Sequence, residues 1–324
     1  MLNQTLFDSL GNYKVLVIGD IMLDNYVYGK CTRISPEAPV PVFEILSEEK
    51  MLGGAGNVLK NLKSFGVQTD ILSIVGNDED GNTLKELILE IGVPIESVFT
   101  SSKRCTTLKK RLIAQSQQLI RIDNENNNDI ETEDENRIIN FLNQKINEYD
   151  LVLFSDYAKG LLSKNLCSSI INLCNSNNIK VIIDPKGKYF DKYSNAFLIK
   201  PNLAEAELIM NQKLDSLDSL KKGAFILKEK YNLKKVVVTL GGDGIFYSDT
   251  DEKIIPTINT KIYDVSGAGD TVFASLAVCL LLGISLEDAV KFANVAASIV
   301  IQKFGSESTT IKEVLNKINN EKSN

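Results

Sequence analysis

Five short apolar runs, each bounded by turn residues, recur along this chain at intervals long enough to hold a helix. They are KVLVIGD (14–20), DILSIVG (70–76), DLVLFSD (150–156), IKVIIDP (179–185) and KKVVVTLGG (234–242). Such runs are typical of strands buried on both faces. Helical periodicity lies between and after them, at 54–65, 80–91, 131–148, 163–177, 203–230, 268–282, 286–303 and 310–320. The alternation predicts an α/β fold, a doubly wound and mainly parallel sheet with helices on both faces.

Two segments interrupt this rhythm, about 25–52 and 97–123. Both alternate apolar and polar residues, as strands with one solvated face do. We therefore expect a single domain over residues 1–324 with a small β lid projecting from it. A lid strand such as PVPVFEIL leaves an edge that must be covered, so a lid-to-lid homodimer is expected.

Composition excludes several classes of function. The 324 residues include no histidine, which rules out a serine–histidine hydrolase and leaves acid–base chemistry to Asp, Glu, Lys, Tyr or Cys. A net charge of -6 gives no basic surface for nucleic acid or membrane. The N-terminus lacks a signal peptide, no apolar run approaches the ~20 residues of a membrane span, and the five scattered cysteines form no CxxC pair. A cytoplasmic protein with reduced thiols is expected.

Polar and glycine-rich stretches follow several predicted strands, where open parallel sheets bind ligands. In GDIMLD (19–24), Asp20 and Asp24 either accept hydrogen bonds from ligand hydroxyls or act as a helix cap and a surface acid. In GGAGNV (53–58), the glycines allow close approach to a ligand and Asn57 can present its amide to a polyol. Glycine-rich turns are common, however, and this one lacks the dinucleotide-binding pattern.

PNLAEAE (201–207) and TLGGDG (239–244) also have two interpretations each. Asn202 and Glu205 suit water-mediated Mg²⁺ binding, but they equally form the two ends of a helix capping box. TLGGDG is either a turn beneath a nucleotide or the hairpin turn before IFYS.

In DVSGAGD (264–270), glycines precede an apolar helix. The free N–H groups of a helix start, together with the helix dipole, attract anions. Asp270 either stabilises that dipole or acts as a base.

Taken in order, GD-x3-D, GGAGN, PN-x2-E, TLGG-x-G, SGAGD and AN-x-AAS resemble the ribokinase-like (PfkB-type) carbohydrate kinases, from residue 14 to about 308. RISPEAPVPVFE (33–44), GGAGNVLKNLKSFG (53–66), SQQLIRID (116–123), LFSDYAKG (153–160) and IDPKG (183–187) look like signatures of the bacterial heptose 7-phosphate kinases. The chain departs from the usual pattern at Ser266, where threonine is more common, and at Lys200, where a smaller residue is common.

The resemblance implies a role for each matching residue. Asp270 would be the general base, and Gly267, Ala268 and Gly269 an anion hole for the transferring phosphoryl group. The sugar would be held by Asp20, Asp24, Gly53, Gly54 and Asn57, and its distal phosphate by Arg33, Lys109, Arg111 and Lys159. The ATP–Mg²⁺ side would comprise Asp184, Lys186, Asn202, Glu205, Thr239, Gly241, Gly242, Gly244 and Asn294, with Asn202 and Glu205 holding Mg²⁺ through water.

The reaction implied is ATP-dependent phosphorylation at O1 of D-glycero-β-D-manno-heptose 7-phosphate, a step of ADP-heptose and lipopolysaccharide core synthesis. Alternatives are a ribokinase-like kinase for another sugar or a nucleoside, and a catalytically silent sugar-phosphate sensor. Such kinases are often fused to a nucleotidyltransferase, for which the chain leaves no room, so a stand-alone kinase or one half of a bifunctional enzyme is expected.

Overall fold

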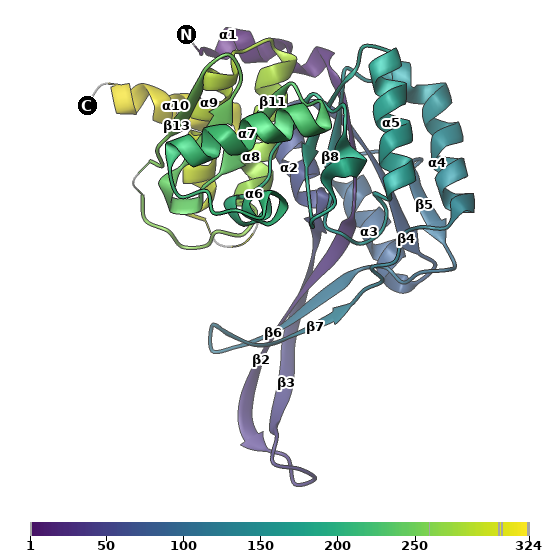
Figure 1. The fold of residues 1–324 in the computed structure, drawn as a ribbon. Coiled ribbons are helices and arrows are strands. Elements are labelled where there is room, and N and C mark those ends of the chain that lie inside the picture. Colours follow the sequence, from purple (N-terminus) through teal and green to yellow (C-terminus); the bar gives the residue numbers. More distant parts are fainter. Residues whose placement is uncertain (1, 259, 304, 306, 323–324) are drawn as a thin grey trace.

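The computed structural model describes residues 2–258, 260–303, 305 and 307–322 of the chain. Within them, a large sheet carries helices on both faces, and a small sheet projects away from it (Figure 1).

The large sheet has nine strands in the order β13-β12-β11-β10-β9-β8-β1-β4-β5, parallel except for β12 and β13. Their bounds are β1 (Lys14–Gly19), β4 (Gln68–Gly76), β5 (Val98–Ser101), β8 (Leu151–Ser155), β9 (Lys180–Asp184), β10 (Leu198–Ile199), β11 (Lys235–Thr239), β12 (Ile245–Ser248) and β13 (Glu252–Ile255). The five predicted strands are confirmed, as is the α/β class. Strand β10 has only two residues, too few to show a periodic pattern.

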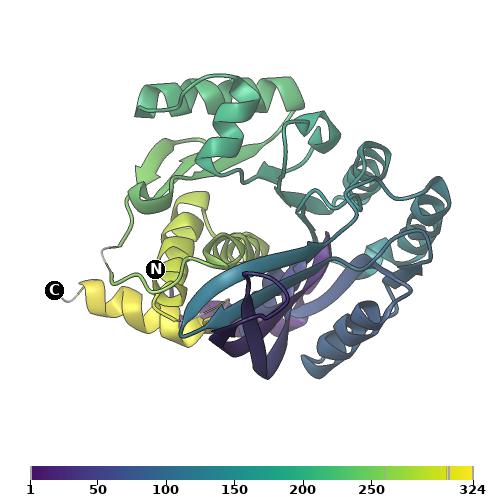
Figure 2. The same ribbon diagram turned by 90° about the horizontal axis from the view of Figure 1, so that it is seen from below.

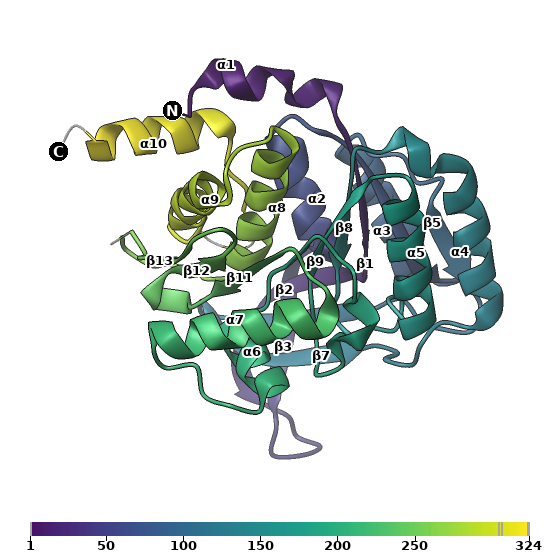
Figure 3. The same cartoon turned by 45° about the horizontal axis from the view of Figure 1, so that its top comes forward.

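Alternation along the strands creates two cores, one on each face of the sheet. In β1, Val15 and Val17 join the core under α2 (Ala55–Ser64), α3 (Glu79–Glu90), α8 (Ala268–Leu281), α9 (Leu286–Val300) and α10 (Ile311–Lys322). Leu16 and Ile18 join the core under α4 (Thr132–Lys145), α5 (Lys164–Ser176) and α7 (Leu217–Tyr231). In Figure 3, α8 and α9 lie on one side of β1 and β8, and α4 and α5 lie on the other. Each fully buried aliphatic side chain stabilises the fold by about 1.5–3 kcal/mol, which explains why most positions of the central strands are apolar.

The helices are α1 (Gln4–Phe7), α2 (Ala55–Ser64), α3 (Glu79–Glu90), α4 (Thr132–Lys145), α5 (Lys164–Ser176), α6 (Leu203–Met210), α7 (Leu217–Tyr231), α8 (Ala268–Leu281), α9 (Leu286–Val300) and α10 (Ile311–Lys322). The helix predicted over 203–230 is wrong in one respect, because it is two helices. Asn211, with a φ of 48°, ends α6, and the Ser216 side chain caps the start of α7. None of the helices in the described ranges is long and apolar enough to cross a membrane.

The small sheet, called the lid below, consists of β2 (Ile21–Ile34), β3 (Pro41–Gly54), β6 (Leu108–Ala114) and β7 (Gln117–Asn124), in the order β3-β2-β6-β7. Strands β2 and β3 are its long arm (Figure 1), and seen from below the lid lies across the middle of the molecule (Figure 2). The predicted lid segment 97–123 begins too early, because the lid strand β6 starts only at Leu108. Val98–Ser101 pairs in parallel with β4 at the edge of the large sheet, since a right-handed crossover through α3 returns the chain there.

Candidate active site

The carboxyl ends of the parallel strands meet along one edge of the large sheet, and polar residues follow most of them. Asp20 follows β1, Tyr157 lies two positions beyond β8, Asp184 ends β9, and Lys200 follows β10. Two adjoining cavities open here, an inner one of ≈ 220 Å³ and an outer, more apolar one of ≈ 470 Å³. Asn202, Thr239 and Gly269 line both cavities, so a ligand can extend from one into the other.

Helix α8 begins between these cavities. Gly267 adopts a left-handed conformation, with a φ of 75°, and among the described residues no side chain caps this helix end. An added side chain at Gly269 would meet nothing within 4 Å, so the space beside the first turn is open. The first-turn N–H groups and the helix dipole make this opening a site for an anion such as a phosphoryl group.

Asp270 lies in that first turn and is only 6% exposed. Burial raises the pKa of its carboxyl group, whereas hydrogen bonds from Tyr157 and Asn57 and the charges of Lys200 and Lys60 act in the opposite direction. The Tyr157 hydroxyl donates to Asp270 Oδ1 over 2.7 Å. Asp270 is therefore an oriented carboxylate with raised proton affinity, the chemistry a general base requires.

Asn57 lies beside Asp270 with one unsatisfied group. Its Oδ1 atom is buried and has no hydrogen-bond partner among the described residues. A buried acceptor without a partner costs free energy, so this atom is suited to accept a hydrogen bond from a ligand hydroxyl.

Asp24, Gly53 and Arg111 meet at the root of the lid. Arg111 Nη1 lies 2.5 Å from Asp24 Oδ1, and the guanidinium covers the Tyr26 ring at 5.0 Å. A side chain at Gly53 would collide with the Asp24 carboxylate, and Gly54 has a φ of 59° that favours glycine. Both positions therefore require glycine for packing within the chain itself, and their predicted contact with a ligand stays a prediction.

Asp20 does not have the surroundings predicted for a sugar-binding carboxylate. Its oxygens accept hydrogen bonds from the backbone N–H groups of Tyr157, Lys159 and Leu161, at 2.9, 3.1 and 3.3 Å. The side chain is buried, and burial with the nearby Asp156 charge raises its pKa to about 6. The geometry makes Asp20 an anchor for the loop that follows β8.

Three of the four predicted phosphate-binding cations lie near one another, and one does not. Lys109 is half-buried, and desolvation together with the charges of Lys159, Arg121 and Arg111 lowers its pKa. Its neighbouring carboxylate, Asp24, is paired with Arg111, and Lys159 is paired with Glu125 at 2.8 Å. Arg121, which the sequence analysis missed, lies opposite Arg111 across the β6–β7 ladder.

Arg33 is the exception. It is exposed and lies near the outer end of β2, nine residues beyond Asp24 on the long arm of the lid. The strand carries Arg33 away from the two cavities, which do not include it among their lining residues, so its contact with the distal phosphate stays a prediction without support from this geometry.

The residues expected on the nucleotide side divide between the two cavities. Six of them line the outer cavity: Asn202, Thr239, Gly241, Gly242, Gly244 and Asn294. Asp184, Lys186 and Glu205 line the inner one. The turn 240–244 is both the hairpin between β11 and β12 and a wall of the outer cavity, so the two interpretations of TLGGDG are compatible.

Asn202 and Glu205 form the capping box of α6. The Asn202 side chain accepts from Glu205 N–H at 2.9 Å, Glu205 Oε2 accepts from Asn202 N–H at 3.0 Å, and Lys186 Nζ lies 2.6 Å from Glu205 Oε1. The described residues contain no group of three or more Asp, Glu, Cys or His that could hold a metal ion. Because Asn202 Oδ1 and both oxygens of Glu205 already have partners, these two residues fit contact with the waters of a hydrated ion better than direct ligation.

Lys200 is a buried cation that was noted only as a departure from the family pattern. It is 3% exposed, and its Nζ lies 3.0 Å from Asp184 Oδ1. Burial raises the pKa of Asp184 to about 7 even though the charge of Lys200 acts to lower it. Its position directly after a strand could have indicated a place in the site, but β10 has only two residues and was not recognised as a strand from the sequence.

Comparisons with known proteins agree with this geometry. The profile described as pfkB family carbohydrate kinase matches residues 12–313. The bifunctional protein HldE of Sulfurimonas denitrificans is 44% identical over 303 residues, which cover 93% of this chain and 63% of that protein. HldE of Helicobacter pylori strain P12 is 43% identical over 302 residues, covering 93% and 66%. The chain thus spans about two thirds of the length of these relatives.

Solved structures share the fold at low sequence identity. Phosphofructokinase-2 from Escherichia coli, in complex with potassium, superposes with a TM-score of 0.78 at 20% identity, covering 96% of this chain and 99% of that one. Arabidopsis thaliana ribokinase complexed with ribose and ATP gives a TM-score of 0.72 at 19% identity, covering 94% and 98%. At such identities the likeness establishes the fold, a ribokinase-like α/β architecture.

Proposed function

The chain belongs to the pfkB family of carbohydrate kinases, enzymes that phosphorylate an alcohol group, and we propose that its acceptor is O1 of D-glycero-β-D-manno-heptose 7-phosphate. The product is the 1,7-bisphosphate, an intermediate of ADP-heptose and lipopolysaccharide core synthesis. The observation that carries the proposal is the group of cations at the lid root, Lys109, Arg111 and Lys159, near Asp24. The HldE relatives support it.

Asp270 takes the proton from the sugar hydroxyl as that oxygen attacks the γ-phosphorus. The first turn of α8, at Gly267, Ala268 and Gly269, stabilises the charge on the transferring group. Phosphoryl transfer requires positioning and charge stabilisation more than covalent catalysis, which suits a rigid helix start beside a fixed carboxylate.

ATP occupies the outer cavity with its phosphates directed into the inner one, where Lys186 and Lys200 supply positive charge. Asn202 and Glu205 would hold a nucleotide-bound Mg²⁺ through its waters, and the ion would neutralise charge on the phosphates. The sugar lies against Asp24, Gly53, Gly54 and Asn57. Its distal phosphate contacts Lys109, Arg111 and Lys159, because a half-buried cation surrounded by like charges is relieved by a bound dianion.

A coupled kinase assay tests this assignment directly. We expect turnover with ATP and the heptose 7-phosphate, and little with ribose, fructose or the unphosphorylated heptose. The variant Asp270→Asn keeps the shape of the site but cannot accept the proton, so it should bind both substrates and lose about 10²–10⁴ in kcat.

Binding of the substrates to Asp270→Asn, measured by calorimetry, separates lost chemistry from lost folding. Turnover of ribose or fructose without turnover of the heptose phosphate would show that the acceptor is another sugar. Binding of the sugar phosphate without any turnover by the unmodified chain would favour a silent sensor.

We also propose that the lid pairs with the lid of a second copy of this chain. Its strands expose large apolar side chains that an isolated sheet would leave in water: Ile45, Leu46, Leu119, Ile120 and Ile122, each 49–64% exposed. An apolar surface of this kind on a projecting sheet is typical of an interface.

A further inference from the structure

A tyrosine hydroxyl lies on the carboxylate that we propose as the base. Tyr157 donates to Asp270 Oδ1 over 2.7 Å, although the two residues are 113 positions apart in sequence. Burial and the charge of Asp270 raise the pKa of Tyr157 well above its ordinary value, so the hydroxyl keeps its proton and acts as a donor. A donor to a charged carboxylate forms one of the stronger hydrogen bonds in proteins.

The backbone around Tyr157 is held on one side by Asp20. This buried carboxylate accepts the N–H groups of Tyr157, Lys159 and Leu161, as described above. Arg104, itself largely buried, donates to the carbonyl of Lys159 and, over 3.2 Å, to that of Asn126. The loop 157–161 is thus held through both its N–H groups and a carbonyl by charged partners.

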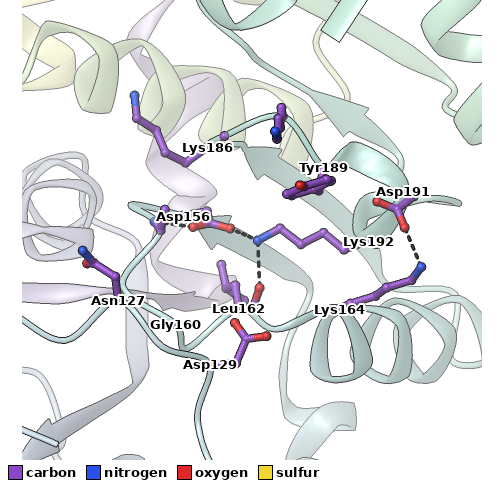
Figure 4. A pocket seen from close by; sticks show the side chains of 13 residues that line it. Asn127, Asp129, Asp156, Gly160, Leu162, Lys164, Lys186, Tyr189, Asp191 and Lys192 are labelled. Carbon is purple, nitrogen blue, oxygen red and sulfur yellow. Dashed lines mark hydrogen bonds and ion pairs between the residues drawn. The ribbon is translucent and has the colours of Figure 1, made fainter. Parts of the chain in front are cut away.

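The other side of the same loop lines a cavity of ≈ 580 Å³, where a second set of charged groups holds it (Figure 4). Asp156 Oδ1 accepts the N–H of Ala158 at 2.6 Å, which stabilises the left-handed φ of 56° at that residue. Lys192 Nζ donates to Asp156 Oδ2 at 2.5 Å and to the carbonyl of Leu162 at 2.8 Å. Tyr193 also donates to Asp156 Oδ2, at 2.6 Å.

From this arrangement we propose that Tyr157 is a positioning residue for Asp270, and that Asp20 acts in the reaction through Tyr157 rather than by binding sugar. The proposal rests on the proposed role of Asp270 as the base. With one oxygen held by Tyr157, the carboxylate keeps a fixed orientation and directs its remaining lone pairs toward the acceptor hydroxyl. The backbone that carries the tyrosine is held at several atoms by charged partners, and its hydroxyl is held by Asp270, an arrangement that favours a fixed side chain over a gate.

Asp270 is surrounded by donors and charges from four segments of the chain. They are Tyr157 after β8, Asn57 and Lys60 on α2, Asp184 at the end of β9 and Lys200 after β10. Because the tyrosine hydrogen bond lowers the pKa of Asp270, its removal raises that pKa while the other groups remain. The base is then protonated over a wider acidic range.

The variant Tyr157→Phe tests the proposal in the full chain, with ATP and the sugar phosphate as substrates. We expect kcat near neutral pH to fall about ten-fold, the size expected for one hydrogen bond to a charged group, with little change in either KM. The acidic limb of the kcat–pH profile should move to higher pH by about half a unit to one unit.

Tyr149→Phe is the matched control. Tyr149 also donates to a carboxylate, Asp70 Oδ2 at 2.9 Å, but it lies before β8, at the opposite end of that strand from the site. This variant should keep both the kcat and the pH profile of the parent.

An unchanged pH profile in folded Tyr157→Phe would overturn the positioning role. So would increased ATP hydrolysis without sugar at an unchanged kcat, because that result describes a gate. Asp270→Asn separates this inference from the proposed function. If Asp270→Asn turns over normally, Asp270 is not the base; if it is inactive while Tyr157→Phe is fully active, only the inference about Tyr157 fails.

Discussion

Three buried carboxylates at the carboxyl edge of the large sheet differ in the groups that surround them. Burial raises the pKa of Asp20, Asp184 and Asp270 alike. Asp20 faces backbone N–H groups, Asp184 faces Lys200, and Asp270 faces Tyr157, Asn57 and the open start of α8. Of the three, Asp270 alone lies in the open first turn of α8, so its position and partners, rather than its burial, favour it as the proposed base.

The Lys200–Asp184 pair leads to a prediction on stability. Burial raises the pKa of Asp184 to about 7 and so favours its protonated form in the folded chain at acidic pH, whereas the charge of Lys200 acts to lower that pKa. In Lys200→Met the pKa of Asp184 rises further. As pH increases, the variant therefore continues to lose stability above the pH at which the stability of the parent levels off. The free energy of unfolding of Lys200→Met should be lower than that of the parent, and we expect this difference to be larger by about 1–2 kcal/mol at about pH 8.5 than at about pH 6.

Urea denaturation at the two pH values measures this difference. Lys235→Met is the control, because Lys235 forms an ion pair with Asp249 in which both side chains are more exposed. Its deficit should be small and nearly independent of pH. A deficit in Lys200→Met that does not change with pH would show that the lysine does not neutralise Asp184.

At the scale of elements, the lid strands decide which charges face the substrate. Successive residues of a strand point to opposite faces, so neighbouring lysines on β6 have different surroundings. Lys109 lies near Asp24, Lys159 and Arg111, whereas Lys110 lies 3.9 Å from Glu48 on the adjacent arm. One strand thus supplies a proposed phosphate ligand and a surface ion pair at consecutive positions.

This pair of lysines gives a matched test of the distal-phosphate site. Lys109→Ala should raise the KM for the sugar phosphate about ten-fold or more and leave the KM for ATP unchanged, because it removes one charge-assisted contact to the phosphate. Lys110→Ala should leave both KM values unchanged. Equal effects of the two variants would mean that general surface charge, and not a defined site, attracts the substrate.

At the scale of the whole molecule, the lid projects from the main body and leaves its apolar side chains exposed (Figure 1). Among the described residues, the two buried cores lie on the large sheet and reach the lid only at its root, through Ile21, Leu23 and Leu52. A second copy that covers the lid would also lie near the exposed Arg33. The oligomeric state therefore bears on whether Arg33 can take part in a site.

We expect the chain to be a dimer by light scattering at micromolar concentration, and the double variant Ile45→Lys, Ile120→Lys to be a monomer. Both residues are more than half exposed, at 56% and 53%, so the substitutions should not unfold the protomer. Phe225→Lys, which changes a side chain of α7 that is 60% exposed, should remain a dimer. A parent chain that is itself monomeric would contradict the lid-to-lid interface.

The sequence alone determined the elements that depend on local pattern. Apolar runs predicted β1, β4, β8, β9 and β11, because burial on both faces favours apolar residues along a strand. Glycines before an apolar run predicted the open start of α8, because the free N–H groups there follow from the helix geometry itself. The order of the motifs along the chain indicated the family.

Tertiary structure alone decided which of these residues contact one another. Asp20 and Asp24 look equivalent in GDIMLD, but only the first meets the N–H groups of a loop 137 to 141 positions further on. Likewise Tyr157 became part of the site because β8 lies beside β1 and carries its loop to α8. A carboxylate's role is set by its nearest donors in space, and local sequence patterns carry no information about partners more than a hundred residues away.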